Sequence, residues 1–276
     1  MLFDILLVPF GATYAQMREA ALVTEDAGFN GLWTFDHLRA PEPAGGSVPE
    51  CWTVLSALAE ATSRIQLGPL VLNVINRRPG LLANMAATLQ DVSHGRLLLG
   101  IGAGGGPGTP WVAELEALGG VPEHDRVRAE RVAEAAQVLR QLWTTDAPAF
   151  EGRHYQLRRP TDFLRPNPVP PIVIAGFGPR MAAIAGRCGD GFNTHAGNSA
   201  LAALIEVARR ERVVSAGSLD GFEVSVFAGL GPRWLATASP ERARLVTLGI
   251  GRLILQVEPP YPLDEIRRAG AQLLKT

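Results

Sequence analysis

The sequence predicts an α/β fold of the (β/α)8 TIM-barrel class, in which parallel strands alternate with helices around a closed ring. Short apolar runs typical of strands buried on both faces alternate along the chain with stretches of helical periodicity. The 276 residues match the usual length of one such barrel. No interdomain linker interrupts the alternation, so residues 1–276 are expected to form a single domain.

The expected elements alternate from one end of the chain to the other. The strands are expected at residues 4–8, 31–36, 65–74, 96–102, 172–175, 191–195, 222–228 and 252–257. The helices are expected at residues 14–27, 52–62, 79–92, 124–143, 179–187, 200–214, 240–248 and 262–274. Residues 62–106 contain the clearest strand–helix–strand unit, because Leu82, Met85 and Leu89 recur at helical spacing between two apolar runs.

Three segments are insertions into this pattern. Residues 39–50 after the second strand and 103–123 after the fourth are rich in glycine and proline, so we expect loops of the kind that often cover a site. Residues 149–160 predict a small hairpin before the fifth strand, turning at Glu151 and Gly152. Sites in this fold class lie on loops at the carboxyl ends of strands. That rule selects residues 9–11, 36–37, 73, 102–106, 176–179, 195 and 258.

The composition argues against several classes of protein. The formal net charge is −1, with acids and bases dispersed, which gives no electrostatic basis for binding nucleic acid or an anionic membrane. The apolar amino end has no preceding basic region and breaks at Pro9 and Gly11, which predicts a cytoplasmic protein without a signal peptide. Two distant cysteines and five histidines without ligand spacing predict neither a disulfide nor a metal site.

Two glycine-rich segments and one acid–base pair are candidates for chemistry. Residues 100–105 fit the dinucleotide pattern G-x-G-x-x-G, but Pro107 follows where a helix would have to begin, which favours an ordinary loop with open backbone angles. Residues 176–179 join a strand to a helix, so their N–H groups could hold a phosphate, although a plain tight turn is an alternative. Asp36 and His37 end the second strand, where they could transfer a proton or form a helix cap or surface pair. His195 ends the sixth strand in a similar position.

An ordered series of short motifs covers residues 25–195. The motifs are 27–29 (AGF), 32–33 (LW), 36–37 (DH), 62–65 (TSRI), 67–68 (LG), 78–79 (RP), Ala83, 88–89 (TL), Ser93, 95–96 (GR), 100–104 (GIGAG), Phe150, Gly152, Tyr155, 171–176 (PIVIAG) and 189–192 (GDGF). The series resembles the luciferase-like superfamily of barrel oxidoreductases, and more closely its branch that depends on coenzyme F420, a deazaflavin. The last third of the chain matches only in its rhythm of strands and helices.

This resemblance implies an oxidoreductase that transfers a hydride between C5 of the deazaflavin and a small organic substrate. It implies that Asp36 and His37 are the catalytic pair beside the ring, with His37 as proton donor or acceptor, and that His195 and Phe10 contact substrate. The implied cofactor-binding residues are Asp36, Leu70, Val71, Asn73, Gly102, Ala103, Gly104, Gly176, Phe177, Gly178, Pro179, Arg180 and Met181. Among these, the bond between Leu70 and Val71 would be cis, Asn73 would bond the ring edge, and residues 176–181 would hold the phosphate.

Two departures from the resembled branch limit the expected substrate. Relatives that oxidise glucose 6-phosphate have a glutamate at the position of Gly105 and a lysine at that of Asn198. A phosphorylated sugar is therefore not expected, and proton transfer cannot depend on a carboxylate at position 105. A monooxygenase using reduced flavin mononucleotide, FMN, and a non-catalytic flavin-binding protein are the alternatives. The resemblance also suggests a homodimer formed through residues 79–92.

Overall fold

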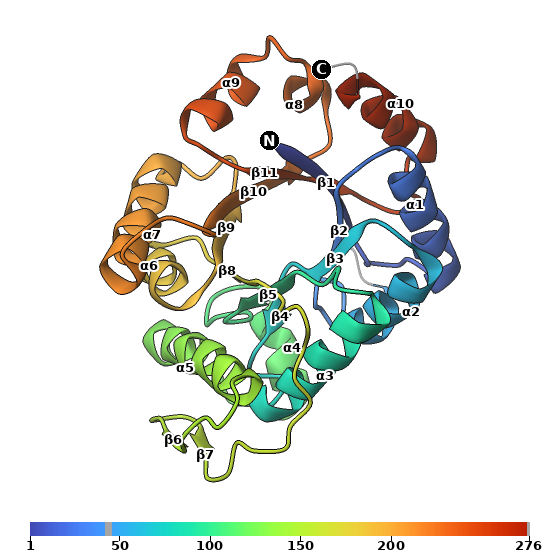
Figure 1. Ribbon diagram of the computed structural model, residues 1–276. Coiled ribbons are helices and arrows are strands. Elements are labelled where there is room, and N and C mark those ends of the chain that lie inside the picture. Colours follow the sequence, from blue (N-terminus) through green and yellow to red (C-terminus); the bar gives the residue numbers. More distant parts are fainter. Residues whose placement is uncertain (42–45, 275–276) are drawn as a thin grey trace.

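The computed structural model describes residues 1–41 and 46–274, and its strands form a ring enclosed by helices (Figure 1). The ring follows the order β3-β2-β1-β11-β10-β9-β8-β5-β4 with parallel pairing throughout. Its strands are β1 (Leu2–Leu7), β2 (Gly31–Thr34), β3 (Gln66–Pro69), β4 (Leu72–Asn73), β5 (Leu99–Gly102), β8 (Ile172–Ala175), β9 (Gly191–His195), β10 (Glu223–Gly229) and β11 (Arg252–Val257). The predicted TIM-barrel class is confirmed.

The third predicted strand is divided into β3 and β4, so the nine strands occupy eight positions in the ring. The peptide bond between Leu70 and Val71, at the division, is cis, which confirms the geometry implied by the resemblance. β3 pairs with β2, whereas β4 pairs with β5. A parallel bridge between Leu67 and Leu97 completes the ring, with the Leu98 N–H donating to the Leu67 carbonyl at 2.8 Å. The predicted continuous strand over residues 65–74 was therefore wrong.

The eight predicted helices are present, and the described residues contain two additional short ones. The predicted helices are α1 (Tyr14–Asp26), α2 (Cys51–Ala61), α3 (Pro79–Val92), α5 (Asp125–Trp143), α6 (Pro179–Cys188), α7 (Leu201–Ala216), α9 (Pro240–Thr247) and α10 (Leu263–Leu273). The additional helices are α4 (Val112–Ala117), inside the predicted loop 103–123, and α8 (Pro232–Leu235), after β10. Among the described helices, none has the length and apolar character needed to cross a bilayer.

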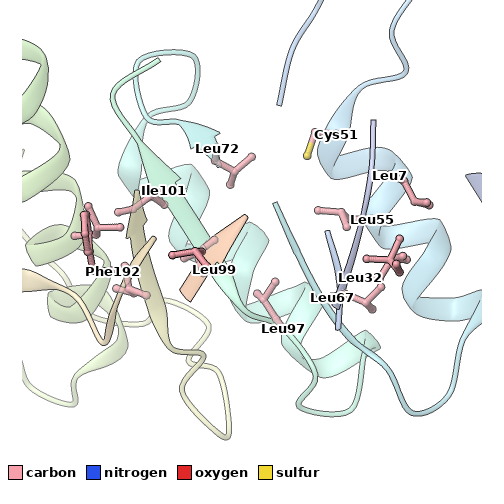
Figure 2. Close-up of a cluster of buried hydrophobic side chains, with 14 of the residues drawn as sticks. Leu7, Leu32, Cys51, Leu55, Leu67, Leu72, Leu97, Leu99, Ile101 and Phe192 are labelled. Atoms are coloured by element: carbon pink, nitrogen blue, oxygen red, sulfur yellow. The ribbon is translucent and has the colours of Figure 1, made fainter. Parts of the chain in front are cut away.

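Alternating side chains of the strands supply two apolar layers. In β1, Ile5 and Leu7 belong to the large layer between the strands and the helices, whereas Leu6 lies inside the ring with Trp33 of β2. This alternation is expected because successive side chains of a strand point to opposite faces. Figure 2 shows part of the outer layer, with Leu7 of β1, Leu67 of β3 and Leu55 of α2 among its labelled side chains. The barrel is therefore a packed core whose mouth is formed by the carboxyl ends of the strands.

The insertion over residues 149–160 is a hairpin at the edge of the molecule (Figure 1), as predicted. Its strands β6 (Phe150–Glu151) and β7 (Gln156–Leu157) are antiparallel, and Glu151 pairs with Gln156. The turn therefore covers residues 152–155, so the prediction was right for Gly152 and wrong for Glu151, which belongs to β6. The carboxylate of Glu134 accepts the N–H groups of residues 153–155 and so determines the turn.

The loop predicted over residues 39–50 is only partly described. Arg39 and Ser47 form an isolated antiparallel bridge, and the Ser47 carbonyl accepts the Gly11 N–H at 3.0 Å. Residues 42–45 of this predicted loop lie outside the described residues. The bridge brings the two ends of the segment together next to the turn that follows β1.

Candidate active site

Aromatic side chains from distant parts of the chain meet at the mouth of the barrel. Phe10 follows β1, Phe35 follows β2, Phe227 belongs to β10, and Phe177 follows β8. The ring centroids of Phe10 and Phe35 are 6.2 Å apart, those of Phe35 and Phe227 6.5 Å, and those of Phe227 and Phe177 6.3 Å. We refer to these four side chains as the mouth cluster. Phe10, Phe35 and Phe227 pack against the inner apolar layer and give the mouth an apolar floor, whereas Phe177 is 68% exposed.

His37 lies at the side of the mouth cluster in a tightly defined position. Its ring stacks on Trp111 with 3.9 Å between centroids and 24° between planes, and its centroid is 5.6 Å from that of Phe10. Its Nδ1 atom is 3.0 Å from Oε1 of Glu114. The side chain of His37 is 20% exposed, so the imidazole is accessible but largely enclosed by its neighbours. The structure therefore places the predicted proton-transfer residue at the mouth.

Asp36, adjacent in sequence, is used differently. Its side chain is fully buried, and its two oxygens accept bidentate hydrogen bonds from the guanidinium of Arg77 at 2.6 and 2.9 Å. Oδ2 also accepts the backbone N–H of Asn73 at 2.9 Å. Such paired, charge-assisted hydrogen bonds fix both partners. Asp36 thus attaches the chain at β4 to the end of β2.

Arg77 extends this attachment to α2 by forming a second ion pair with Glu50. Glu50 is the N-cap of α2 and accepts the N–H groups of Trp52 and Thr53. Burial alone would lower the pKa of Arg77, but hydrogen bonds and charges from Asp36 and Glu50 raise it above its ordinary value. Burial acts to raise the pKa of Glu50, and the donors from Thr53, Trp52 and Arg77 outweigh it and lower the pKa.

The glycine-rich segment after β5 receives the side chain of Asn73. Gly104 has a φ of +66°, and a Cβ built on it would lie 2.3 Å from Nδ2 of Asn73. Arg128 of α5 donates to the carbonyls of Ala103, at 2.9 Å, and Gly104. The carbonyls of this segment thus accept hydrogen bonds from the guanidinium of Arg128. This arrangement agrees with an ordinary loop and not with a dinucleotide-binding turn. Gly102, the last residue of β5, pairs with Asn73 of β4.

Position 105 has no room for a side chain. A Cβ on Gly105 would lie 2.4 Å from Cβ of Trp111, and its next nearest neighbours are backbone atoms of Trp111. Trp111 precedes α4, and Glu114 is three residues further along the chain. The short helix α4 and its N-cap residue Trp111 therefore occupy the space beside the mouth, where Glu114 bonds to His37 and Trp111 stacks on it. A cavity of about 220 Å³ next to α4 is lined by Pro41, Trp111 and Glu114 among others.

The turn 176–181 follows β8 and leads directly into α6. Gly176 packs so closely that a Cβ on it would lie 2.2 Å from Cβ of Met181, whereas nothing lies within 4 Å of a Cβ on Gly178. Gly178 is the N-cap of α6, with Pro179 at N1 and no side-chain hydrogen bond at the cap. The turn is thus open at the positive end of a ten-residue helix. The side chain of Arg180, in the first turn, is exposed.

His195 joins the mouth cluster from the side of β9. Its ring meets that of Phe227 edge to face with 5.0 Å between centroids, and its Nδ1 accepts the N–H of Gly197 at 3.0 Å. Asn198, nearby, donates its amide to the Phe177 carbonyl at 3.2 Å. The structure therefore brings the predicted substrate residues Phe10 and His195 to one opening, on either side of Phe35 and Phe227.

The sequence profile of the luciferase-like monooxygenase family matches residues 6–244. The chain belongs to this family. One relative, an F420-dependent glucose-6-phosphate dehydrogenase of Amycolatopsis mediterranei (strain U-32), is 34% identical over 175 residues, which cover 63% of this chain and 51% of the relative. The chain thus spans about half the length of such relatives.

Solved structures of the same fold cover nearly the whole chain. An F420-dependent secondary alcohol dehydrogenase in complex with an F420–acetone adduct superimposes with a TM-score of 0.81 at 20% identity, covering 99% of this chain and 98% of the other. A monooxygenase of Streptomyces bottropensis has a TM-score of 0.74 at 22% identity, covering 100% and 98%. At these identities the likeness concerns the fold alone.

Three residues at the mouth of the barrel were not predicted from the sequence: Arg77, Trp111 and Glu114. Trp111 lies in the segment 103–123, which the glycines and prolines predicted to be a loop. A usable signal was present, because Trp111 and Glu114 are three residues apart and would share one face of a helix. Arg77 had no comparable local signal, since its partner Asp36 lies 41 residues earlier.

Proposed function

We propose that the chain is a coenzyme F420-dependent oxidoreductase that acts on a small organic substrate at the mouth of the barrel, with His37 as proton donor or acceptor. The observation that carries the proposal is the imidazole of His37, stacked on Trp111 and bonded to Glu114, beside the mouth cluster. An imidazole so placed suits general acid–base catalysis near neutral pH. The F420-dependent relative named above supports the choice of cofactor.

The residues present fit a deazaflavin with a phosphate-bearing tail. The N-terminus of α6 lacks a side-chain cap, and Gly178 leaves open space there, so residues 176–181 would hold the phosphate. Leu70, Val71 and Asn73 would contact the ring, together with residues 102–104. The bound deazaflavin would supply the hydride acceptor or donor at C5. Asp36 would act on this site indirectly, by holding Arg77 and the backbone of Asn73.

The protein's own part in the reaction would be orientation, exclusion of water and movement of one proton. When a substrate alcohol is oxidised, His37 would take the hydroxyl proton, and in the reverse direction it would return that proton to the carbonyl oxygen. Phe10 and Phe227 would cover the apolar part of the substrate, and His195 would contact it from the opposite side. Such positioning accounts for much of the rate when the cofactor supplies the chemistry.

A small, weakly polar alcohol or carbonyl compound fits this opening better than a phosphorylated sugar. The amide of Asn198 donates to the Phe177 carbonyl and its oxygen accepts the Ala200 N–H, so the side chain is engaged within the protein. Position 105 has no side chain, and Trp111 fills the space beside it. The remaining surface is largely aromatic, as is typical of pockets for small organic ligands.

The direct test is a titration of the purified protein with oxidised F420 and, separately, with FMN, followed by absorbance or fluorescence. The proposal predicts saturable binding of F420. Binding of FMN alone would instead support the monooxygenase alternative, and binding of neither would contradict both. Binding of F420 without turnover across a screen of alcohols, aldehydes, ketones and enones would support a non-catalytic flavin-binding protein.

The variant His37→Ala tests the assigned proton transfer. Turnover should fall by about 10²–10⁴-fold, the usual contribution of a positioned general acid or base, while the dissociation constant for F420 changes little. His124→Ala is a suitable control, because His124 precedes α5 and its side chain makes no capping hydrogen bond. Unchanged turnover in His37→Ala would remove His37 from the mechanism.

The homodimer through residues 79–92 and the cytoplasmic location stay predictions. α3 has an exposed leucine, Leu81, which is 61% accessible and could contribute to a contact between copies. Sedimentation velocity of the wild-type protein and of Leu81→Glu would test the dimer, because a charge at that contact should shift the distribution toward the monomer. A monomeric wild-type protein would contradict it.

A further inference from the structure

We infer that Glu114 is a positioning residue for His37: it fixes the imidazole as the Nδ1–H tautomer, so that Nε2 is the nitrogen that exchanges a proton with substrate. The catalytic consequence of this inference rests on the proposed function. The contacts of Glu114 from which it is argued are contacts within this chain. It assigns a role to a residue of α4, a helix that the sequence did not predict.

Three donors converge on one oxygen of Glu114. Oε1 lies 3.0 Å from Nδ1 of His37 and accepts the backbone N–H groups of Leu38 at 3.2 Å and Arg39 at 3.3 Å. The two backbone groups can only donate, so this oxygen is an acceptor and does not point a proton toward the ring. The hydrogen between Oε1 and the imidazole must then belong to Nδ1. In the neutral ring this leaves the lone pair on Nε2.

The N-cap residue of α4, Trp111, fixes the plane of the ring. Trp111 stacks on His37 at 3.9 Å, and it can occupy this place because Gly105 has no side chain there. Phe10 stacks on Trp111 at 5.8 Å and so supports the arrangement from the mouth cluster. The imidazole of His37 is therefore held at Nδ1 by Glu114 and over its face by Trp111. The second contact is possible because Gly105 has no side chain.

The pairing of Glu114 with His37 also explains how a positive charge on the imidazole can be stabilised at the mouth without an acid at position 105. When Nε2 takes a proton from a substrate hydroxyl, the ring becomes an imidazolium, and Glu114 faces its Nδ1–H. A carboxylate in that position stabilises the positive ring as it forms. Asp36 is not available for this task, because both its oxygens are bonded to Arg77.

The tautomer can be read directly in the cofactor-free protein. Long-range ¹H–¹⁵N spectra of histidine-labelled protein, recorded at alkaline pH where the rings are neutral, should show His37 protonated at Nδ1 and bare at Nε2, with His37→Ala identifying the signals. Glu114→Gln should keep this tautomer, because the amide oxygen can occupy the place of Oε1 and still accept all three donors. Glu114→Ala should give a mixture of tautomers. Glu116→Ala, an exposed carboxylate on the same helix, should leave the spectrum unchanged.

Turnover gives the second readout. Glu114→Ala should lower kcat at least about tenfold, within the range that a positioned general acid or base contributes, and leave the dissociation constant for F420 nearly unchanged. Glu114→Gln should recover part of that loss, and it also retains the acceptor for Leu38 and Arg39 if the alanine variant folds poorly.

Protonation of His37 at Nε2 in the wild-type spectrum, or an unchanged tautomer in Glu114→Ala, would overturn the inference. Absence of F420 binding with the tautomer as expected would remove the proposed function and leave the pairing of Glu114 with His37 intact, so the two failures are distinguishable.

Discussion

The two ends of the barrel each contain an aspartate, an arginine and a glutamate joined by ion pairs. At the amino ends of the strands, Arg252 binds Asp4 at 2.6 Å and Glu223 at 2.7 Å, and we call this set the lower triad. At the mouth, Arg77 binds Asp36 at 2.6 Å and also Glu50, and we call this set the upper triad. In both triads the aspartate is fully buried and the glutamate is over a third exposed.

The contacts of the lower triad give it a structural role, because they connect strands of the ring to one another. Asp4 also accepts the Trp33 indole N–H at 2.6 Å, and Arg252 donates to Gln66 at 2.9 Å, so the triad connects β1, β2, β3, β10 and β11. Burial is the largest influence on Asp4 and raises its pKa, although the charge of Arg252 and the Trp33 N–H act to lower it. The polar atoms of this cluster serve the closure of the ring.

The upper triad joins loops and helix ends instead of strands. It attaches Asn73 and the N-terminus of α2 to the residue before His37. The comparison teaches that one set of residue types can serve two purposes, closure of the barrel at one end and alignment of a mouth at the other. Next to the upper triad, the bond between Glu114 and His37 leaves one imidazole nitrogen available for chemistry.

Arg252→Met should have the largest effect on stability and so test the role of the lower triad. Removing one partner of a buried ion pair leaves an uncompensated charge and typically costs about 3–5 kcal/mol. Urea unfolding followed by circular dichroism would measure the loss. Arg267→Met is the matched control, because Arg267 pairs with Asp264 at the surface and should change stability by less than about 0.5 kcal/mol. Equal stability of the two variants would show that the lower triad does not support closure.

Arg77→Met should lose less stability and more ligand binding. The Arg77 side chain is 11% exposed against 4% for Arg252, so we expect a cost near the lower end of the range for buried pairs, about 3 kcal/mol. Loss of the anchor for Asp36 would free the backbone at Asn73, and the dissociation constant for F420, measured by fluorescence titration, should rise at least about tenfold. A folded Arg252→Met protein is the comparison, since its binding should be near normal. Unchanged binding in Arg77→Met would mean that the upper triad does not align the mouth.

Most of the framework could be predicted from the sequence because its signals are local. The apolar runs and helical periods located the eight strand positions and eight helices, and the rule for barrel loops selected Phe10, His37 and His195, which do meet at the mouth. The division of the third strand had no local signal. The cis bond between Leu70 and Val71 came from the resemblance to a family and not from the residues themselves.

The partners of the mouth residues could not be predicted, because they depend on the paths of long loops. His37 and Glu114 are 77 residues apart, and Asp36 and Arg77 are 41 apart. Glycines and prolines on both sides of α4 obscured a helix of six residues. The sequence shows that position 105 has no carboxylate, but it did not show that Glu114 would face His37.

The smallest expected effect is the loss of stability when Glu50, the exposed member of the upper triad, loses its charge. The size of this effect depends on pH. The pKa of Glu50 is lowered in the folded protein, so its contribution to stability is present above about pH 4.5, its ordinary value, and is lost as the pH falls through the folded value. Because its side chain is 40% exposed, Glu50→Gln should cost less than about 1 kcal/mol at pH 7. Unfolding free energies measured from pH 7 to pH 3 should converge for wild type and variant at the acid end. Glu19→Gln, an exposed site on α1, should show no such convergence. A constant difference across this range would mean that the charge of Glu50 contributes nothing, and that Asp36 and Arg77 align the mouth as a pair.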